Sequence, residues 1–223
     1  MPKITIDDLG LQILCEPDEK YIQVDDITDA GLRAIWPRLV ADYPGFHVDF
    51  TFHNTLAPIG FLNEIGAEVA DDCIEARLLQ KDLIEPPAAE ANLAITRIDA
   101  SNYATFAALH DKANPEMYWT STRLKKNIES GGRWDIFGIF DGETLRSYGF
   151  LRSWEIYCVH ADRNDIEAHV ALIAAMSKQA FEIDPNADVL FMIDVKDYVQ
   201  LGAALHLGFR RAGHYISYSV TAK

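Results

Sequence analysis

Two adjacent prolines, Pro86 and Pro87, constrain the fold of this chain of 223 residues more than any other local feature. Proline lacks a main-chain N–H and its ring clashes with the preceding helical turn, so neither residue can lie inside a helix or a central strand. Alanines and acidic residues surround the pair over residues 81–92, a composition typical of a linker. We therefore expect an N-terminal domain at residues 1–80 and a C-terminal domain at residues 93–223.

The N-terminal part alternates between strand and helix patterns. Short strands are expected within residues 3–25, an amphipathic helix at 28–42, a strand at 47–52, a short helix at 58–65 and a strand at 68–78. Thr28 or Asp29 is placed to cap the first helix, and Gly66 to end the second.

The C-terminal part has a different order of patterns. It predicts a strand at 93–98, helices at 103–113 and 117–130, strands at 134–140, 145–154 and 155–160, a helix at 164–183, a strand at 189–195, a helix at 197–207 and a strand at 210–220. Asp141-Gly142 predicts a tight hairpin turn. Asn164 followed by Glu167 predicts the N-terminus of the longest helix.

The two ends of the chain repeat one pattern. Residues 48–78 and 189–220 both read strand, loop, short helix, glycine, strand. The residues that match in step are Gly66 with Gly208, Ala70 with Ala212, and Ile74 with Ile216. The pattern favours an internal duplication, although strand–helix–strand units are common enough to arise separately.

Net charge restricts the partners. The chain has 20 Lys and Arg against 34 Asp and Glu, a net charge of −14. Phosphates of duplex nucleic acid and of anionic membranes would be repelled, so neither is an expected partner. A cationic small molecule would be attracted.

The three cysteines, Cys15, Cys73 and Cys158, are far apart and lack metal-ligand spacing. Free thiols in a reducing compartment are the simplest interpretation, and no metal site is expected. The first residues have no apolar signal segment, and no apolar run approaches the length of a membrane span. We expect a cytoplasmic protein.

The order of elements in residues 91–223, together with Leu207-Gly208-Phe209 at the end of a late helix, resembles the GNAT superfamily of N-acetyltransferases. The resemblance implies an α/β (α+β) fold with a mixed, mostly antiparallel central sheet flanked by helices. The N-terminal part resembles only the latter half of such a domain, and would be a truncated repeat. Acetyl-CoA is implied as the co-substrate, bound where the strands at 155–160 and 189–195 diverge.

The resemblance also implies where acetyl-CoA lies. Its pantetheine would pair with the first of these strands, and its pyrophosphate would meet main-chain N–H groups at the start of the next helix, where the helix dipole favours anions. The implied cofactor-binding residues are Cys158, Val159, His160, Arg163, Asn164, Asp165, Ile166, Glu167 and Ala168.

The loop departs from the family pattern at one position. The pattern is Arg or Gln, two residues, Gly, one residue, then Gly or Ala; Arg163 and Ala168 match it, whereas Ile166 replaces the glycine. A β-branched side chain there would hinder a phosphate from reaching the backbone. Asp162, Asp165 and Glu167 add repulsion, although Asn164, Asp165 and Glu167 are also ordinary helix-start residues.

Catalytic candidates follow from the same resemblance. Many members carry a tyrosine acid four residues before the glycine of Leu-Gly-Phe, where this chain has Ala204. The nearest alternatives in sequence are Tyr198, Tyr215 and Tyr218, of which Tyr215 is the candidate acid, and packing in the sheet or core is the alternative interpretation of each. Glu155 is the candidate base, because the neighbouring indole of Trp154 could desolvate its carboxylate and raise its pKa. His160 is a second candidate, and an exposed strand-end acid is the alternative interpretation of Glu155.

Four residues are candidates for the acceptor pocket: Tyr118, Trp119, Trp134 and Asp194. Core packing is the alternative for the aromatic residues, and helix capping for Asp194 or Asp197. The sequence thus predicts acetyl transfer from acetyl-CoA to a small amine. A GNAT-fold protein without activity, serving as a binding or scaffold module, is the alternative hypothesis, and a homodimer is compatible with both.

Overall fold

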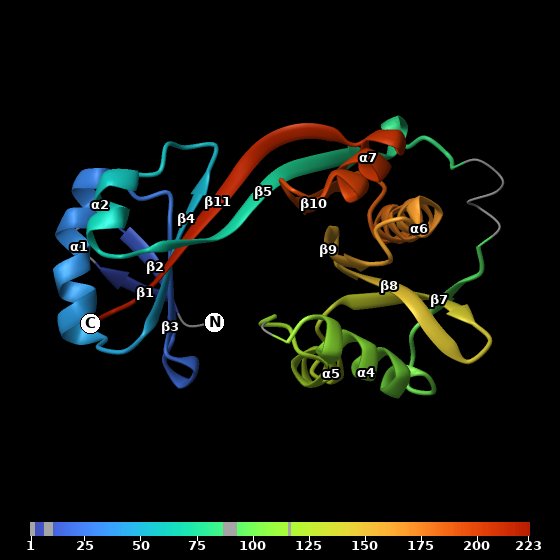
Figure 1. The fold of residues 1–223 in the computed structure, drawn as a ribbon, viewed down its shortest axis with the longest axis horizontal. Coiled ribbons are helices and arrows are strands. Elements are labelled where there is room, and N and C mark those ends of the chain that lie inside the picture. The colour runs from blue at the N-terminus through green and yellow to red at the C-terminus, as the bar shows by residue number, and fades with distance from the viewer. Residues whose placement is uncertain (1–2, 7–10, 87–92, 116) are drawn as a thin grey trace. The chain divides into compact units, whose positions relative to one another are not determined.

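The structure is a computed structural model that describes residues 3–6, 11–86, 93–115 and 117–223. It divides into two compact units (Figure 1). Unit 1 comprises Met1–Ile74 and Gly213–Lys223, and unit 2 comprises Glu75–Ala212.

Unit 1 contains most of the N-terminal elements and the end of the chain. They are β1 (Lys3–Ile6), β2 (Leu11–Glu16), η1 (Pro17–Glu19), β3 (Tyr21–Asp25), α1 (Asp29–Asp42), β4 (His47–His53), α2 (Ile59–Glu64), most of β5 (Glu68–Leu79) and most of β11 (Arg210–Thr221). The strand order is β1-β2-β3-β4-β11-β5, with β3 and β4 parallel and β4 and β11 antiparallel.

Strand alternation gives the sheet of unit 1 one apolar face. Ile22 and Val24 of β3 and Phe50 of β4 are buried with Leu32 and Ile35 of α1. Figure 1 shows α1 and α2 together at this sheet. The helix covers the apolar face because its own buried residues recur at helical spacing.

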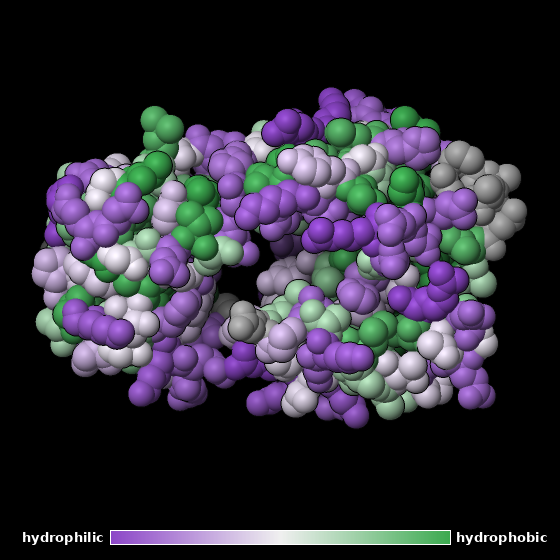
Figure 2. Space-filling model, in the orientation of Figure 1, coloured by the Kyte–Doolittle hydropathy of each residue, from purple (hydrophilic) through white to green (hydrophobic). Residues whose placement is uncertain are grey.

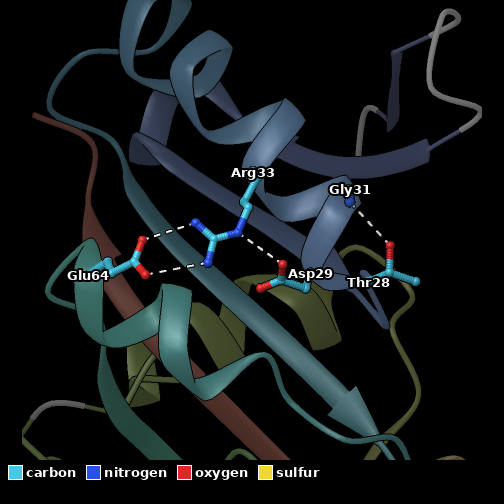
Figure 3. A network of polar contacts seen from close by, with 5 residues as sticks. All are labelled: Thr28, Asp29, Gly31, Arg33 and Glu64. Carbon is cyan, nitrogen blue, oxygen red and sulfur yellow. Dashed lines mark hydrogen bonds and ion pairs between the residues drawn. The ribbon is translucent and has the colours of Figure 1, made fainter.

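A polar network holds the start of α1 (Figure 3). The Thr28 hydroxyl accepts a hydrogen bond of 3.2 Å from Gly31 N, which confirms Thr28 as the N-cap. The Arg33 guanidinium lies between the carboxylates of Asp29, at 2.9 Å, and Glu64 of α2, at 3.0 Å. These hydrogen bonds and ion pairs stabilise the N-terminus of α1 and its contact with α2.

Unit 2 contains the remaining elements: η2 (Gln80–Asp82), β6 (Ile95–Arg97), α4 (Tyr103–Ala113), α5 (Ser121–Glu129), β7 (Trp134–Asp141), β8 (Thr144–Arg152), β9 (Glu155–His160), α6 (Ile166–Ile183), β10 (Asp188–Asp194) and α7 (Tyr198–His206). Its strand order is β5-β10-β9-β8-β7-β6. The strands β6, β7, β8 and β9 each pair antiparallel with the next one along the chain, and β9 and β10 pair in parallel.

Helices cover both faces of this sheet (Figure 1). One core lies under α6, where Met176 packs so close to Gly149 of β8 that a Cβ on the glycine would approach within 2.6 Å of the methionine methyl. The other core lies under α4 and α5 and includes Phe106, Leu124 and Phe150. Two cores on opposite faces leave the ends of the strands as the places where a ligand can approach.

Two strands, β5 and β11, contribute residues to both units. The end of β5 belongs to unit 2 beside β10, whereas β11 from Gly213 onward belongs to unit 1 beside β4. The expected boundary at residues 81–92 follows chain order and places β11 with the C-terminal domain, so it differs from these units. Residues 87–92 of the expected linker lie outside the described residues.

The mixed sheet flanked by helices confirms the predicted fold class. The helix expected to begin at 117 begins at Ser121, because the Thr120 hydroxyl caps it by accepting from Arg123 N. Gly142 has φ +60° in the predicted hairpin turn, and Gly208 has φ +95° at the end of α7. A Cβ on Gly208 would collide with the main-chain oxygen of Asp82, so glycine is required there for a second reason.

The visible surface is mostly hydrophilic, with scattered apolar residues (Figure 2). Within the described residues, no helix combines the length and apolarity that crossing a membrane requires.

Candidate active site

The parallel strands β9 and β10 separate shortly after they begin. Their register pairs are Glu155 with Leu190 and Ile156 with Phe191, although β9 continues to His160 and β10 to Asp194. We call the place where they separate the β9–β10 opening. It exposes the main chain of β9 on the side away from β8, at the position where the sequence predicts acetyl-CoA.

A β-bulge lies at the same level of β9. Phe150 pairs with Cys158 and Leu151 with Ile156, so Tyr157 is the extra residue. Its ring stacks on Phe150 at 5.9 Å and meets Trp134 edge-on at 5.6 Å. A bulge bends its strand and redirects the following peptide groups.

Val159 presents its peptide groups to the opening. The Cys158 oxygen points towards β8, since a Cβ on Gly149 would lie 3.1 Å from it. Neighbouring residues of a strand direct their peptide groups to opposite sides, so those of Val159 point the other way. Gln200 of α7 marks this direction, because its Nε2 donates a 3.3 Å hydrogen bond to Val159 O.

Gln200 is also held within its own helix. Its Nε2 donates to Asp197 Oδ2 at 2.8 Å, and its main-chain N donates to Asp197 Oδ1 at 2.9 Å. Asp197 is therefore the N-cap of α7, as the sequence predicts.

The loop from β9 to α6 binds its own carboxylates. Asp162 Oδ1 accepts from Asn164 N at 2.8 Å, and Asp165 Oδ1 accepts from Ala168 N at 3.0 Å. The predicted cap at Asn164 is wrong: α6 begins at Ile166, and Asp165 is the residue whose side chain reaches the N–H three positions on. Arg146 lies 3.5 Å from the Asp165 carboxylate.

An open groove of about 450 Å³ lies between α6 and α7. Its lining residues are Ile166, Val170, Tyr198, Val199, Gly202, Ala203 and His206. Ile166 is the first residue of α6 and 56% exposed, so its side chain stands at the helix start where the family pattern has glycine. Arg163 and Glu167 are exposed residues of the same loop and helix start.

Glu155 begins β9 directly before the opening. Burial raises the pKa of its carboxyl above the ordinary value, and the nearby Arg152 guanidinium partly opposes this increase. Trp154 is 50% exposed. A partly buried carboxylate with a raised pKa can accept a proton near neutral pH.

The three aromatic candidates form one cluster. The ring of Trp134 lies 4.9 Å from that of Trp119, which lies 5.2 Å from that of Tyr118. Arg152 Cζ lies 5.7 Å from the Trp119 ring and 5.6 Å from the Trp134 ring. Trp134 Nε1 donates to Asn127 Oδ1 at 3.0 Å, which fixes its orientation.

A buried polar chain fixes Trp119 from behind. His110 Nε2 lies 2.8 Å from Trp119 O, which requires a proton on Nε2, so Nδ1 accepts from Tyr148 Oη at 2.9 Å. Asn114 Nδ2 donates to the same Tyr148 oxygen at 2.7 Å. His160 stacks on Tyr148, and burial with the neighbouring His110 and His169 lowers the pKa of His160.

Three candidates have other surroundings. Burial raises the pKa of the Cys158 thiol to about 12, so this thiol is protonated at neutral pH. Asp194 is exposed and accepts from Lys196 N at 2.7 Å in the turn before α7. Tyr215 lies in unit 1, where its ring is 5.0 Å from that of His53.

Sequence reasoning missed Arg152, Tyr157 and Gln200. Arg152 and Gln200 belong to no motif, and their contacts join residues distant in sequence. The bulge at Tyr157 has no glycine or proline to mark it.

Comparisons with known proteins agree with this geometry at the level of the fold. The chain has the fold of the GNAT N-acetyltransferases. A functionally unknown protein from Staphylococcus epidermidis is 14% identical with a TM-score of 0.67, and the match covers 99% of this chain and 94% of that one. A tandem GNAT protein from the clavulanic acid biosynthesis pathway is 12% identical with a TM-score of 0.61, covering 96% and 78%.

A GCN5-related N-acetyltransferase from Kribbella flavida is 14% identical with a TM-score of 0.55, covering 94% of this chain and 86% of that one. No protein-family model and no curated protein matches the chain.

Proposed function

We propose that the protein is an N-acetyltransferase that transfers an acetyl group from acetyl-CoA to a small amine. The observation that carries the proposal is the β9–β10 opening, where the N–H and C=O of Val159 point away from β8 and the partly buried Glu155 lies at the end where the two strands are still paired. An unpaired strand edge binds an extended, amide-containing arm such as pantetheine, and here the arm would take the place of Gln200 at Val159 O.

Two groups of unit 2 would act on the reaction. Val159 N–H would donate a hydrogen bond to the thioester oxygen and stabilise the negative charge that develops there. Glu155 would take a proton from the ammonium group, so that the amine nitrogen can form the C–N bond as the C–S bond breaks. The sulfur of CoA departs as a thiolate and takes up a proton from water.

The pyrophosphate end of the site fits acetyl-CoA less well. The carboxylates of Asp162 and Asp165 already accept from main-chain N–H groups in the loop, and Ile166 projects from the helix start. We therefore expect acetyl-CoA to bind weakly and mainly through β9 and the groove between α6 and α7.

The same loop supports a second candidate function. The carboxylate of Asp165 accepts the main-chain N–H that a phosphate would otherwise bind, and the buried Ala204 stands where many family members have a tyrosine acid. With these features the protein would serve as a binding or scaffold module with the GNAT fold. Fold alone does not separate the two functions, because activity depends on the site.

A ligand titration tests both. Acetyl-CoA at up to millimolar concentration should raise the thermal unfolding temperature and produce acetylated product with at least one member of an amine panel. No thermal response would contradict acetyl-CoA binding, and a response without transfer to any amine would favour the binding module.

A further inference from the structure

Three residues form a row across β7, β8 and β9. Trp134 pairs with Arg152, and Arg152 pairs with Glu155. Residues directly opposite each other in antiparallel strands share one face of the sheet. Arg152 and Glu155 therefore present a cation and an acid side by side on one face of the sheet, at the end of β9 that is still paired with β10.

The Arg152 guanidinium rests on a fixed aromatic surface. It lies over the rings of Trp119 and Trp134, which pack on each other at 4.9 Å. The two indoles are anchored separately, Trp134 by Asn127 and the Trp119 main chain by His110. Stacking on a ring leaves the N–H groups at the edge of a guanidinium available for a planar anion.

The contacts of Arg152 leave these N–H groups for a ligand. Its side chain is exposed and lies over two indole rings, and its charge acts on the neighbouring Glu155 carboxyl. The indole faces that could attract an ammonium group by a cation–π contact are already covered by Arg152. An amine that approaches this face of the sheet would thus meet Glu155 as its negative partner, and a second group on the same molecule would meet Arg152.

We propose that the acceptor is a small molecule carrying both an amine and a carboxylate, such as an amino acid, with Arg152 binding the carboxylate while Glu155 faces the amine. This proposal rests on the acetyl transfer proposed above. Arg152 and Glu155 are direct cross-strand neighbours and the charge of Arg152 acts on the Glu155 carboxyl, so one small molecule can contact both side chains. The proposal narrows the expected substrate from any cationic small molecule, as the net charge suggested, to a zwitterionic one.

Matched acceptors test the proposal. Each amino acid is compared with its methyl ester and with the amine that lacks the carboxyl group, at saturating acetyl-CoA. We expect the free amino acids to have the highest kcat/KM, and Arg152→Gln to raise their KM about 10-fold or more, because a charge-assisted hydrogen bond is lost. The esters and simple amines should change less than about 3-fold.

Two further variants complete the test. Arg152→Lys keeps the charge without the planar fork and should give an intermediate KM, and Arg211→Gln, which removes an exposed arginine of β11, should leave KM unchanged. Equal kcat/KM for amino acids and their esters, or equal effects of Arg152→Gln on both, would overturn the carboxylate proposal while acetyl transfer stands. Absence of transfer to every acceptor would instead overturn the proposed function.

Discussion

Gln200 Nε2 donates a hydrogen bond of 3.3 Å to the main-chain oxygen of Val159. The bond closes the β9–β10 opening from the side of α7 and uses the acceptor that an amide-containing ligand would need. Gln200 thus competes with the pantetheine arm that we propose for this position.

Replacing Gln200 with alanine should strengthen acetyl-CoA binding. A single exchanged hydrogen bond is worth about 0.5–1.5 kcal/mol, so the dissociation constant should fall about 2- to 10-fold in isothermal titration. The unfolding temperature without ligand should decrease slightly, because α7 loses its link to β9. Gln179→Ala on α6 is the control, and weaker binding by Gln200→Ala would show that Gln200 assists the ligand.

Shortening the side chain at Ile166 should also strengthen acetyl-CoA binding. The affinity should increase in the order Ile, Ala, Gly, since each step clears space at the start of α6 for a phosphate. Glycine costs up to about 1 kcal/mol of helix stability, so the alanine variant separates space from backbone effects. Equal affinity in all three proteins, measured by titration, would contradict a steric role for Ile166.

Glu155→Gln should lower kcat/KM about 100-fold or more if Glu155 is the general base. In the unchanged protein, activity should fall with decreasing pH through a pKa above the ordinary value of glutamate, because burial raises it. Arg152→Gln removes the opposing positive charge, so the decrease in activity should occur at a still higher pH. Glu155 would be excluded as the base if activity decreased at the ordinary pKa of glutamate, or if Glu155→Gln left the rate unchanged.

The same pKa shift predicts the stability of the Glu155→Gln variant. A carboxyl with a raised pKa in the folded state binds more protons folded than unfolded, so its contribution to stability is lost as pH rises from the ordinary to the raised value. The glutamine variant should therefore be at least as stable as the unchanged protein at pH 7 in denaturant unfolding. A loss of activity can then be separated from a loss of folding.

Tyr148→Phe should destabilise unit 2. Tyr148 is fully buried, and its hydroxyl donates to His110 Nδ1 and accepts from Asn114, so the variant takes the hydroxyl donor from His110 Nδ1, whereas Asn114 Nδ2 keeps its 3.2 Å bond to His110 O. A buried polar atom that loses its partner costs about 1–3 kcal/mol, which thermal or urea unfolding would detect. Tyr198→Phe, at a side chain 76% exposed, is the matched control and should leave stability within about 0.5 kcal/mol. A neutral Tyr148→Phe would contradict the hydrogen-bond assignment.

The sequence alone determined the features that depend on near neighbours. Thr28 and Asp197 cap their helices as expected, Asp141-Gly142 makes the hairpin, and Gly208 ends α7, because each outcome follows from the chemistry of a few consecutive residues. The element order that these signals define was sufficient to predict the GNAT fold. The cap at Asp165 was missed by one residue, since adjacent Asn and Asp carry the same signal.

Only the tertiary structure decided how distant segments meet. The division of β5 and β11 between the units, the bulge at Tyr157, the contact of Gln200 with Val159 and the placement of Arg152 over Trp119 all depend on residues from separate elements. No local pattern encodes such contacts, because strand register and side-chain packing depend on the whole assembled core. The sequence therefore indicates the region of the chain that contains the candidate site, whereas the folded structure determines which side chains meet there.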